Sequence, residues 1–199
     1  MEPVCFKLGL NDQAILGVLP ALLSRSPMDR EPPRCIIALD APLSYQPGGG
    51  FRPADRALAD HLRATVVSPG YRPGVMAPTM TRMAYLTLRG VSLTRLLLHP
   101  AADLAVAPEI VEVYPAGSLL LRGAPVDAVR DLRTSPAARV DLLAVLRDRT
   151  AADLPDELAE TDHAIAATAG ALAALDFARG RVAWHHPADP PHHPFAFIC

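Results

Sequence analysis

The sequence predicts an α/β protein in which helices flank a buried sheet. Two short apolar segments support this, 36–40 (Ile-Ile-Ala-Leu-Asp) and 109–113 (Glu-Ile-Val-Glu-Val), and each places an acid close to a proline. Apolar runs of this length, bounded by turn residues, are typical of strands that are buried on both faces. Asp40 would then lie at the carboxyl end of the first strand, where open α/β sheets bind their ligands.

Composition favours one domain, residues 1–199, with a single core. Of the 199 residues, 50% are hydrophobic and only 5% are aromatic, and the formal net charge is −2. This charge argues against a globally basic nucleic-acid binder but leaves room for a local basic groove. Cys5, Cys35 and Cys199 are odd in number and far apart, which favours free thiols in a cytoplasmic protein. No apolar run reaches the roughly 18 residues of a membrane span, so we expect no membrane contact.

The first third of the chain contains a strand, a helix and the first buried strand. Residues 4–10 predict the strand, and Asn11 is a suitable N-cap for a helix over 12–24. The glycine-rich stretch 45–51 lacks both the phosphate-loop lysine and the Rossmann glycine spacing, which favours a mobile loop over a phosphate cradle. A helix is expected from Arg52 to about Arg63.

The middle of the chain alternates irregular and helical segments. Residues 65–80 show turn formers without periodicity, as lids and binding loops do. We expect a helix over 81–89 that Gly90 ends, a second helix or extended piece over 91–98, and the second strand over 106–113. Helices are also predicted over 126–130 and 137–149. The longest helical pattern runs from Asp153 to Arg179 and stops at Gly180.

The last residues, 185–199, form a His- and Pro-rich tract for which two interpretations stay open. Four histidines and Asp189 within 185–193 are a possible metal-binding cluster. However, structural zinc sites usually take their ligands from two separated pairs. We therefore favour a surface tail that packs through Phe195, Phe197 and Ile198.

Three carboxylates form the candidate site: Asp40, Glu112 and Asp162. Two lie on predicted strands and one at the start of the last helix's buried part. If they cluster, a cation must neutralise them, and all-oxygen ligands suit Mg²⁺, with Mn²⁺ as a substitute. Such a site would support phosphodiester cleavage. The plain alternative for each acid is a helix cap or an ion pair.

Further groups near these acids complete the predicted site. His163 would assist proton transfer. Arg52, Asp55 and Arg56 follow the glycine-rich loop and are predicted to bind substrate phosphates. Their alternative role is that of a solvated helix start with a local ion pair.

The chain resembles domain-of-unknown-function family four hundred and twenty-nine. The resemblance rests on ordered motifs at 37–44 (Ile-Ala-Leu-Asp-Ala-Pro-Leu-Ser), 52–56 (Arg-Pro-Ala-Asp-Arg), 110–115 (Ile-Val-Glu-Val-Tyr-Pro) and 162–167 (Asp-His-Ala-Ile-Ala-Ala). The family's members are regarded as predicted nucleases with a ribonuclease-H-like fold. The resemblance therefore implies a ribonuclease-H-like mixed sheet and an acidic metal site that includes Asp40 and Glu112.

Two departures from the family pattern bear on activity. A ribonuclease-H-like domain begins with a strand that carries a central aspartate, whereas only 39 residues precede Asp40 here and the nearest candidate is Asp12. Ala166 also stands where a second aspartate is expected one turn after Asp162. Two interpretations stay open: the chain is a member shortened at its N-terminus, in an active or an inactive form, or something else completes its sheet.

These observations lead to two principal hypotheses. The leading one is a metal-dependent phosphodiesterase acting on nucleic acid, DNA or RNA, through carboxylate-bound Mg²⁺ or Mn²⁺. The alternative is a catalytically inactive ribonuclease-H-like module that binds a partner protein or self-associates through an open sheet edge. A small-molecule phosphotransferase has less support, because the expected glycine loop is missing.

Overall fold

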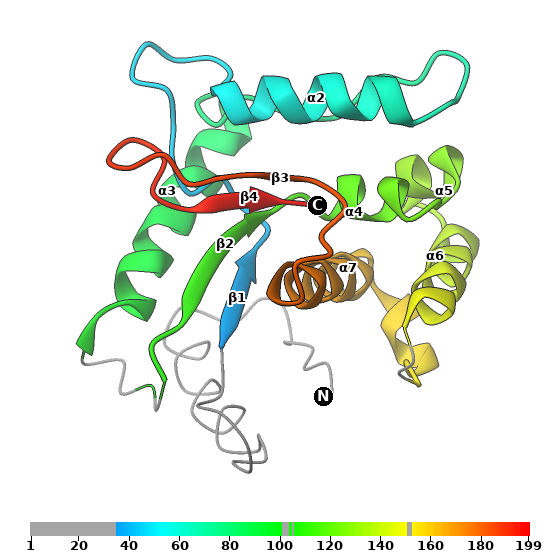
Figure 1. Cartoon of the computed structure of the whole chain (residues 1–199). Coiled ribbons are helices and arrows are strands. Elements are labelled where there is room, and N and C mark those ends of the chain that lie inside the picture. The colour runs from blue at the N-terminus through cyan, green and yellow to red at the C-terminus, as the bar shows by residue number, and fades with distance from the viewer. Residues whose placement is uncertain (1–34, 101–103, 105, 151–152) are drawn as a thin grey trace.

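The computed structural model describes residues 35–100, 104, 106–150 and 153–199. In this part of the chain six α-helices and a short 3₁₀-helix surround a four-stranded mixed sheet (Figure 1). This confirms the α/β class and is compatible with a ribonuclease-H-like fold. The predicted strand 4–10, helix 12–24 and Asp12 lie outside the described residues. The elements are β1 (Ile36–Leu39), α2 (Pro53–Thr65), α3 (Thr81–Leu97), β2 (Glu109–Val113), α4 (Pro115–Leu121), α5 (Val126–Asp131), α6 (Pro136–Arg149), η2 (Asp156–Glu160), α7 (Asp162–Ala178), β3 (His185–His186) and β4 (Ala196–Ile198).

The two acid-bearing strands pair directly in the sheet. The strand order is β1-β2-β4-β3; β1 and β4 run parallel to β2, and β3 runs antiparallel to β4. Leu39 lies opposite Glu112, and Glu112 lies opposite Phe197. Because side chains alternate along a strand, Glu112 shares a face with Ile110 while Val111 and Val113 point to the other face.

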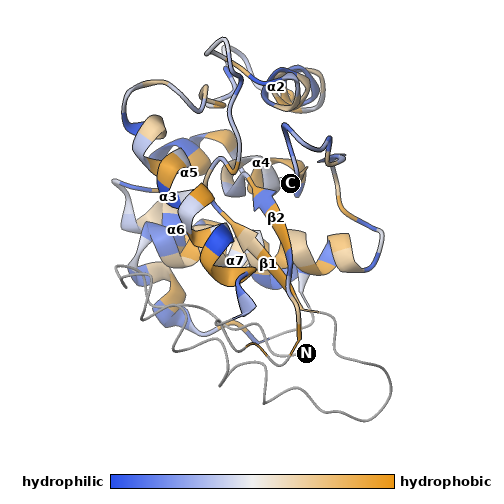
Figure 2. Ribbon diagram, turned by 90° about the vertical axis from the view of Figure 1, so that its left-hand side faces the viewer, coloured by the Kyte–Doolittle hydropathy of each residue, from blue (hydrophilic) through white to orange (hydrophobic). Residues whose placement is uncertain are grey.

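Each face of the sheet is covered by a different helix. Leu93 and Leu97 of α3 pack with Leu43 and Ile110. On the other face Ala173 of α7 packs with the second group of strand residues, Val111, Val113 and Ile198. α3 and α7 accordingly lie on opposite sides of β1 and β2 in Figure 1, and in Figure 2 these two strands are coloured mostly as hydrophobic. β2 is thus buried on both faces, as its continuous apolar run predicts, whereas the four residues of β1 are half-buried.

A second core joins the helices that follow β2. Leu119 of α4, Leu142 and Leu146 of α6 and Ile165 of α7 are completely buried in one cluster. These helices hold the start of α7 next to the sheet.

Both ends of the C-terminal tract 185–199 belong to the sheet, whereas residues 187–192 between them are exposed, as in a surface tail. Ala196–Ile198 form β4, which pairs with β2 on one side and with β3 on the other. Phe197, Ile198 and Cys199 are buried. The prediction that Phe197 and Ile198 pack is correct, but the sequence did not indicate that they insert as an inner strand, because a three-residue strand after prolines has too little periodicity to be recognised.

Two predicted helix boundaries are wrong. Gly90 does not end a helix: α3 continues through it, and a Cβ at this position would lie 2.9 Å from the carbonyl oxygen of Pro42. The glycine therefore permits close packing of the helix against the chain after β1. The single helix predicted from Asp153 is also two separate elements, η2 and α7. Thr161 is the N-cap of α7 and accepts a hydrogen bond from the Ala164 N–H. Gly180 follows the end of α7 with φ of 67°, as predicted.

Within the described ranges, none of the helices is both long enough and apolar enough to cross a bilayer.

Candidate functional site

A buried ion network lies on the face of β2 that carries Glu112. Arg52, the N-cap of α2, donates from Nη2 to Glu112 Oε1 at 2.5 Å and from Nη1 to Oε2 at 2.7 Å. The same guanidinium donates from Nη2 to Asp55 Oδ1 at 2.6 Å. The Leu43 N–H donates to Glu112 Oε2 at 2.9 Å. Both oxygens of Glu112 are therefore engaged.

The local sequence explains why Arg52 is held so firmly. Pro53 is the first helical residue of α2, a position that does not need an N–H donor. Asp55 then accepts the Arg52 backbone N–H at 2.8 Å, so one carboxylate caps the helix and anchors the guanidinium. Arg56 lies one residue further on and is exposed.

Burial and ion pairing act in opposite directions on the charges of this network. Arg52, Asp55 and Glu112 are 3%, 1% and 5% exposed. Burial raises the pKa of Glu112 above its ordinary value, although the bonds from Arg52 act in the opposite direction. For Arg52, burial acts to lower the pKa, but the hydrogen bonds to Glu112 and Asp55 outweigh it and raise the pKa. The guanidinium thus stays charged in the interior.

Asp40 and Asp162 share two basic neighbours, and the charge of Glu112 also acts on Asp40 and raises its pKa. Asp40 follows β1 and is an exposed residue. Asp162 lies at the first residue of α7, with Arg133 Nε at 3.9 Å and His163 Nε2 at 4.0 Å from its carboxylate. Arg133 and His163 are also the two cationic neighbours that act on Asp40. These two acids therefore share their basic neighbours, whereas Glu112 is paired with Arg52.

The Asp40 carboxyl is strongly perturbed. Although the residue is exposed, the protein around the carboxyl desolvates it and raises its pKa to about 6, against the opposing charges of Arg133 and His163. Perturbed carboxyls of this kind are frequent at functional sites.

Asp40→Asn is expected to stabilise the protein at neutral pH but not in acid. Since the folded-state pKa lies above the ordinary value of 3.8, the folded protein loses stability as pH rises through the interval from 3.8 to about 6, and asparagine does not ionise. Thermal unfolding should give equal midpoints at about pH 4 and a higher midpoint for the variant at about pH 7.5. The exposed Asp148 provides the control: at each pH, the unfolding midpoint of Asp148→Asn should equal that of wild type. A variant that is less stable than wild type at neutral pH would contradict the expectation.

The described residues do not fit the predicted three-acid metal cage. In the described ranges no three side chains among His, Cys, Asp and Glu are grouped so that they could hold a metal ion. The bonding of Glu112 agrees, because both of its carboxylate oxygens already accept hydrogen bonds from Arg52. Asp40 and Asp162 stay available as oxygen ligands, and Mg²⁺ often uses only one or two carboxylates.

Ser44 and His193 lie next to this network, although the sequence did not predict either as a site residue. Ser44 Oγ and His193 Nδ1 are 2.8 Å apart, and Arg52 Nη1 donates to the same Oγ at 3.1 Å. Ser44 closes the first family motif and His193 lies in the His-rich tract, but 149 residues separate them. No spacing rule brings such distant residues together.

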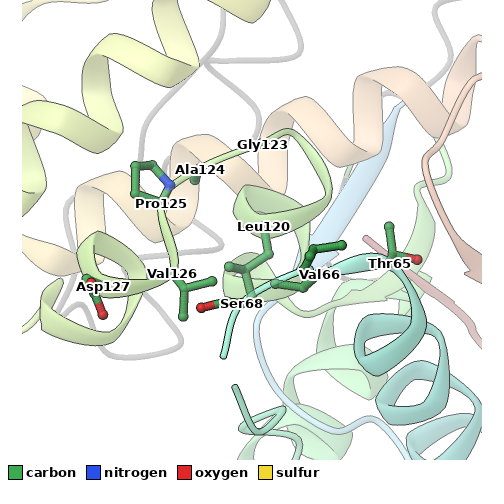
Figure 3. A pocket seen from close by; sticks show the side chains of 10 residues that line it. Thr65, Val66, Ser68, Leu120, Gly123, Ala124, Pro125, Val126 and Asp127 are labelled. Atoms are coloured by element: carbon green, nitrogen blue, oxygen red, sulfur yellow. The ribbon is translucent and has the colours of Figure 1, made fainter. Parts of the chain in front are cut away.

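A surface pocket lies away from these groups. It is bounded by the end of α2 and the connection between α4 and α5 (Figure 3). Its lining contains none of the predicted site residues and consists of Thr65, Val66, Val67, Ser68, Leu120, Gly123, Ala124, Pro125, Val126 and Asp127.

The fold and the site together define an α/β protein with an exposed acid at the carboxyl end of a parallel strand. Comparison with known families agrees with the motifs: the model of the family described as "Protein of unknown function (DUF429)" matches residues 10–192. The chain therefore belongs to the DUF429 family. No curated protein and no solved structure matches it.

Proposed function

We propose that the chain is a phosphodiesterase acting on nucleic acid, with its reactive centre at the carboxyl end of β1. The observation that supports this best is the perturbed carboxyl of Asp40, on which the charges of Arg133 and His163 act. The side chains of Arg133 and His163 are 78% and 61% exposed, so both can meet a phosphate from solvent. A desolvated carboxyl next to accessible cations combines proton transfer with phosphate binding.

The roles of the predicted site residues follow from their accessibility. Exposed Arg133 and Arg56 are the cations that can contact a phosphate backbone, whereas buried Arg52 acts by holding Glu112 and Ser44. Mg²⁺ or Mn²⁺, as the proposed cofactor, would be held by Asp40 and Asp162. A cytoplasmic location is part of the proposal and agrees with free thiols at both described cysteines, Cys35 and Cys199.

Cleavage assays test the proposed activity. Labelled single-stranded, duplex and branched DNA and RNA are incubated with the full chain in Mg²⁺, in Mn²⁺ and in a chelator. We expect cleavage of at least one substrate, and a loss of at least about 100-fold in Asp40→Ala. Asp148→Ala, at an exposed acid on α6, is the matched control and should keep full activity. Cleavage that is unchanged in Asp40→Ala, or none at high protein concentration, would refute the proposal.

A second candidate function, a non-catalytic module that self-associates, is favoured by the outer face of α3. Tyr85, Leu88 and Leu96 share a helical stripe on this face and are exposed large apolar residues. Exposed apolar stripes of this kind often mark contact surfaces. Light scattering after size exclusion should then show a dimer that Leu88→Glu dissociates. A monomer at all concentrations would exclude this candidate.

A further inference from the structure

The side chains of Ser44 and His193 form a hydrogen-bonded pair. The distance of 2.8 Å between Ser44 Oγ and His193 Nδ1 lies within the range in which a histidine activates a hydroxyl. Both residues are half-buried, so they are in contact with solvent as well as with the protein. Ser44 lies four residues after Asp40, on the segment that leaves the carboxyl end of β1.

Arg52 polarises the serine hydroxyl from a second direction. Its Nη1 donates to Ser44 Oγ at 3.1 Å, and its guanidinium is fixed by Asp55 and Glu112. In the tautomer that carries its proton on Nε2, His193 accepts from the hydroxyl, which accepts from Arg52 and keeps one lone pair for attack. The cationic donor also stabilises negative charge that develops on Oγ.

The backbone fixes the position of His193. The Asp189 N–H donates to the His193 carbonyl oxygen at 2.7 Å, and the His193 N–H donates back at 2.9 Å. Desolvation, followed by the charge of Arg52, lowers the pKa of His193, so the ring is neutral near pH 7 and able to accept a proton. The tract that carries it is anchored in turn, since β4 follows within a few residues.

We propose that Ser44 is the nucleophile of this protein and that His193 is its general base. This assignment names the group that would attack the substrate. The claim that the substrate is a phosphodiester rests on the proposed function. With Ser44 as the nucleophile, the reaction does not require a metal ion bound by Glu112 to activate water.

The reaction proceeds in two balanced steps. Ser44 Oγ bonds to phosphorus and the bond to the leaving oxygen breaks, while the serine proton passes to His193 and from there through water to the leaving oxygen. Water then attacks the phosphoserine and gives a proton to His193. Ser44 Oγ leaves and recovers that proton, so that both side chains end unchanged.

The competing explanation is a structural clasp, in which the pair only fastens the C-terminal tract to the Ser44 segment. Both explanations predict that substitution weakens that attachment. Only the nucleophile predicts a covalent adduct on Ser44, so the test must measure one.

A fluorophosphonate probe supplies this measurement. Its phosphorus bonds to Oγ, fluoride leaves, and the serine proton passes to His193. We expect peptide mass spectrometry of the full chain to place the adduct on Ser44, with none at this position in Ser44→Ala. In His193→Ala the labelling rate should fall at least about 100-fold and recover with added imidazole. Two controls should label at the wild-type rate: His192→Ala, which changes the exposed histidine next to His193, and Ser92→Ala, which changes an exposed serine on α3.

The outcomes separate this inference from the proposed function. No adduct on Ser44, in wild-type protein shown by circular dichroism to be folded, overturns the assignment. Nucleic-acid cleavage that persists in Ser44→Ala also overturns it but leaves the phosphodiesterase intact. An adduct on Ser44 without cleavage of any nucleic acid supports the nucleophile and refutes the phosphodiester substrate.

Discussion

Arg52→Ala is expected to destabilise the folded chain by about 3–5 kcal/mol, the largest effect of any single substitution in the described site. The substitution leaves the carboxylate of Glu112 buried without its bidentate partner, and Asp55 keeps only its bond from the backbone N–H of residue 52. Urea unfolding followed by circular dichroism measures the change. Arg52→Lys should recover little of the loss, because one ammonium group cannot reproduce the bonds that the guanidinium makes to both carboxylates.

Two comparisons identify the cause of this loss. Arg63→Ala removes an exposed pair with Asp60 on the same helix and should cost no more than about 1 kcal/mol. The double substitution Arg52→Met with Glu112→Met removes both charges and should be more stable than Arg52→Ala. If the double variant were the less stable of the two, uncompensated burial of Glu112 would not be the cause.

Ile198→Ala is expected to cost about 2–5 kcal/mol, although it lies one residue from the end of the chain. Terminal residues are usually tolerant of change. Ile198, however, has no exposed surface and packs with Val111, Val113 and Ala173 between β2 and α7. The alanine would leave a cavity next to the inner strands of the sheet. Thermal and urea unfolding of the full-length chain measure the loss.

The matched control for Ile198 is Val140 on α6. Its side chain is exposed, so Val140→Ala should change stability by less than about 0.5 kcal/mol. An equally small effect at Ile198 would contradict the placement of the C-terminal tract inside the sheet.

The sequence predicted the local features of the fold correctly where a short pattern decides them. The strands around Ile37 and Val111 follow from apolar runs bounded by turn residues. The start of α2 follows from Pro53 and Asp55, and the end of α7 from Gly180. Each depends on residues within one or two turns of one another, so the information is local.

Prediction failed where a residue's role depends on a distant neighbour. Gly90 has the features of a helix stop, but it serves as a contact point for the chain around Pro42. The 185–199 tract has the composition of a tail, but Phe197 and Ile198 pair with β2, which lies far earlier in the chain. Neither contact has a signature in the local sequence.

The sequence by itself determined the α/β class, the family and the acids that border the sheet, since strand patterns and motifs are properties of neighbouring residues. Only the tertiary structure showed which groups surround each acid. Sixty residues separate Arg52 from Glu112, yet their pairing takes Glu112 out of the predicted metal cage, while Asp40 stays exposed beside Arg133 and His163. Ser44 and His193, 149 residues apart, likewise become partners only when the last strand joins the sheet. The physical reason is that ion pairs and proton transfers depend on distances of a few ångströms in space, which separation along the chain does not specify.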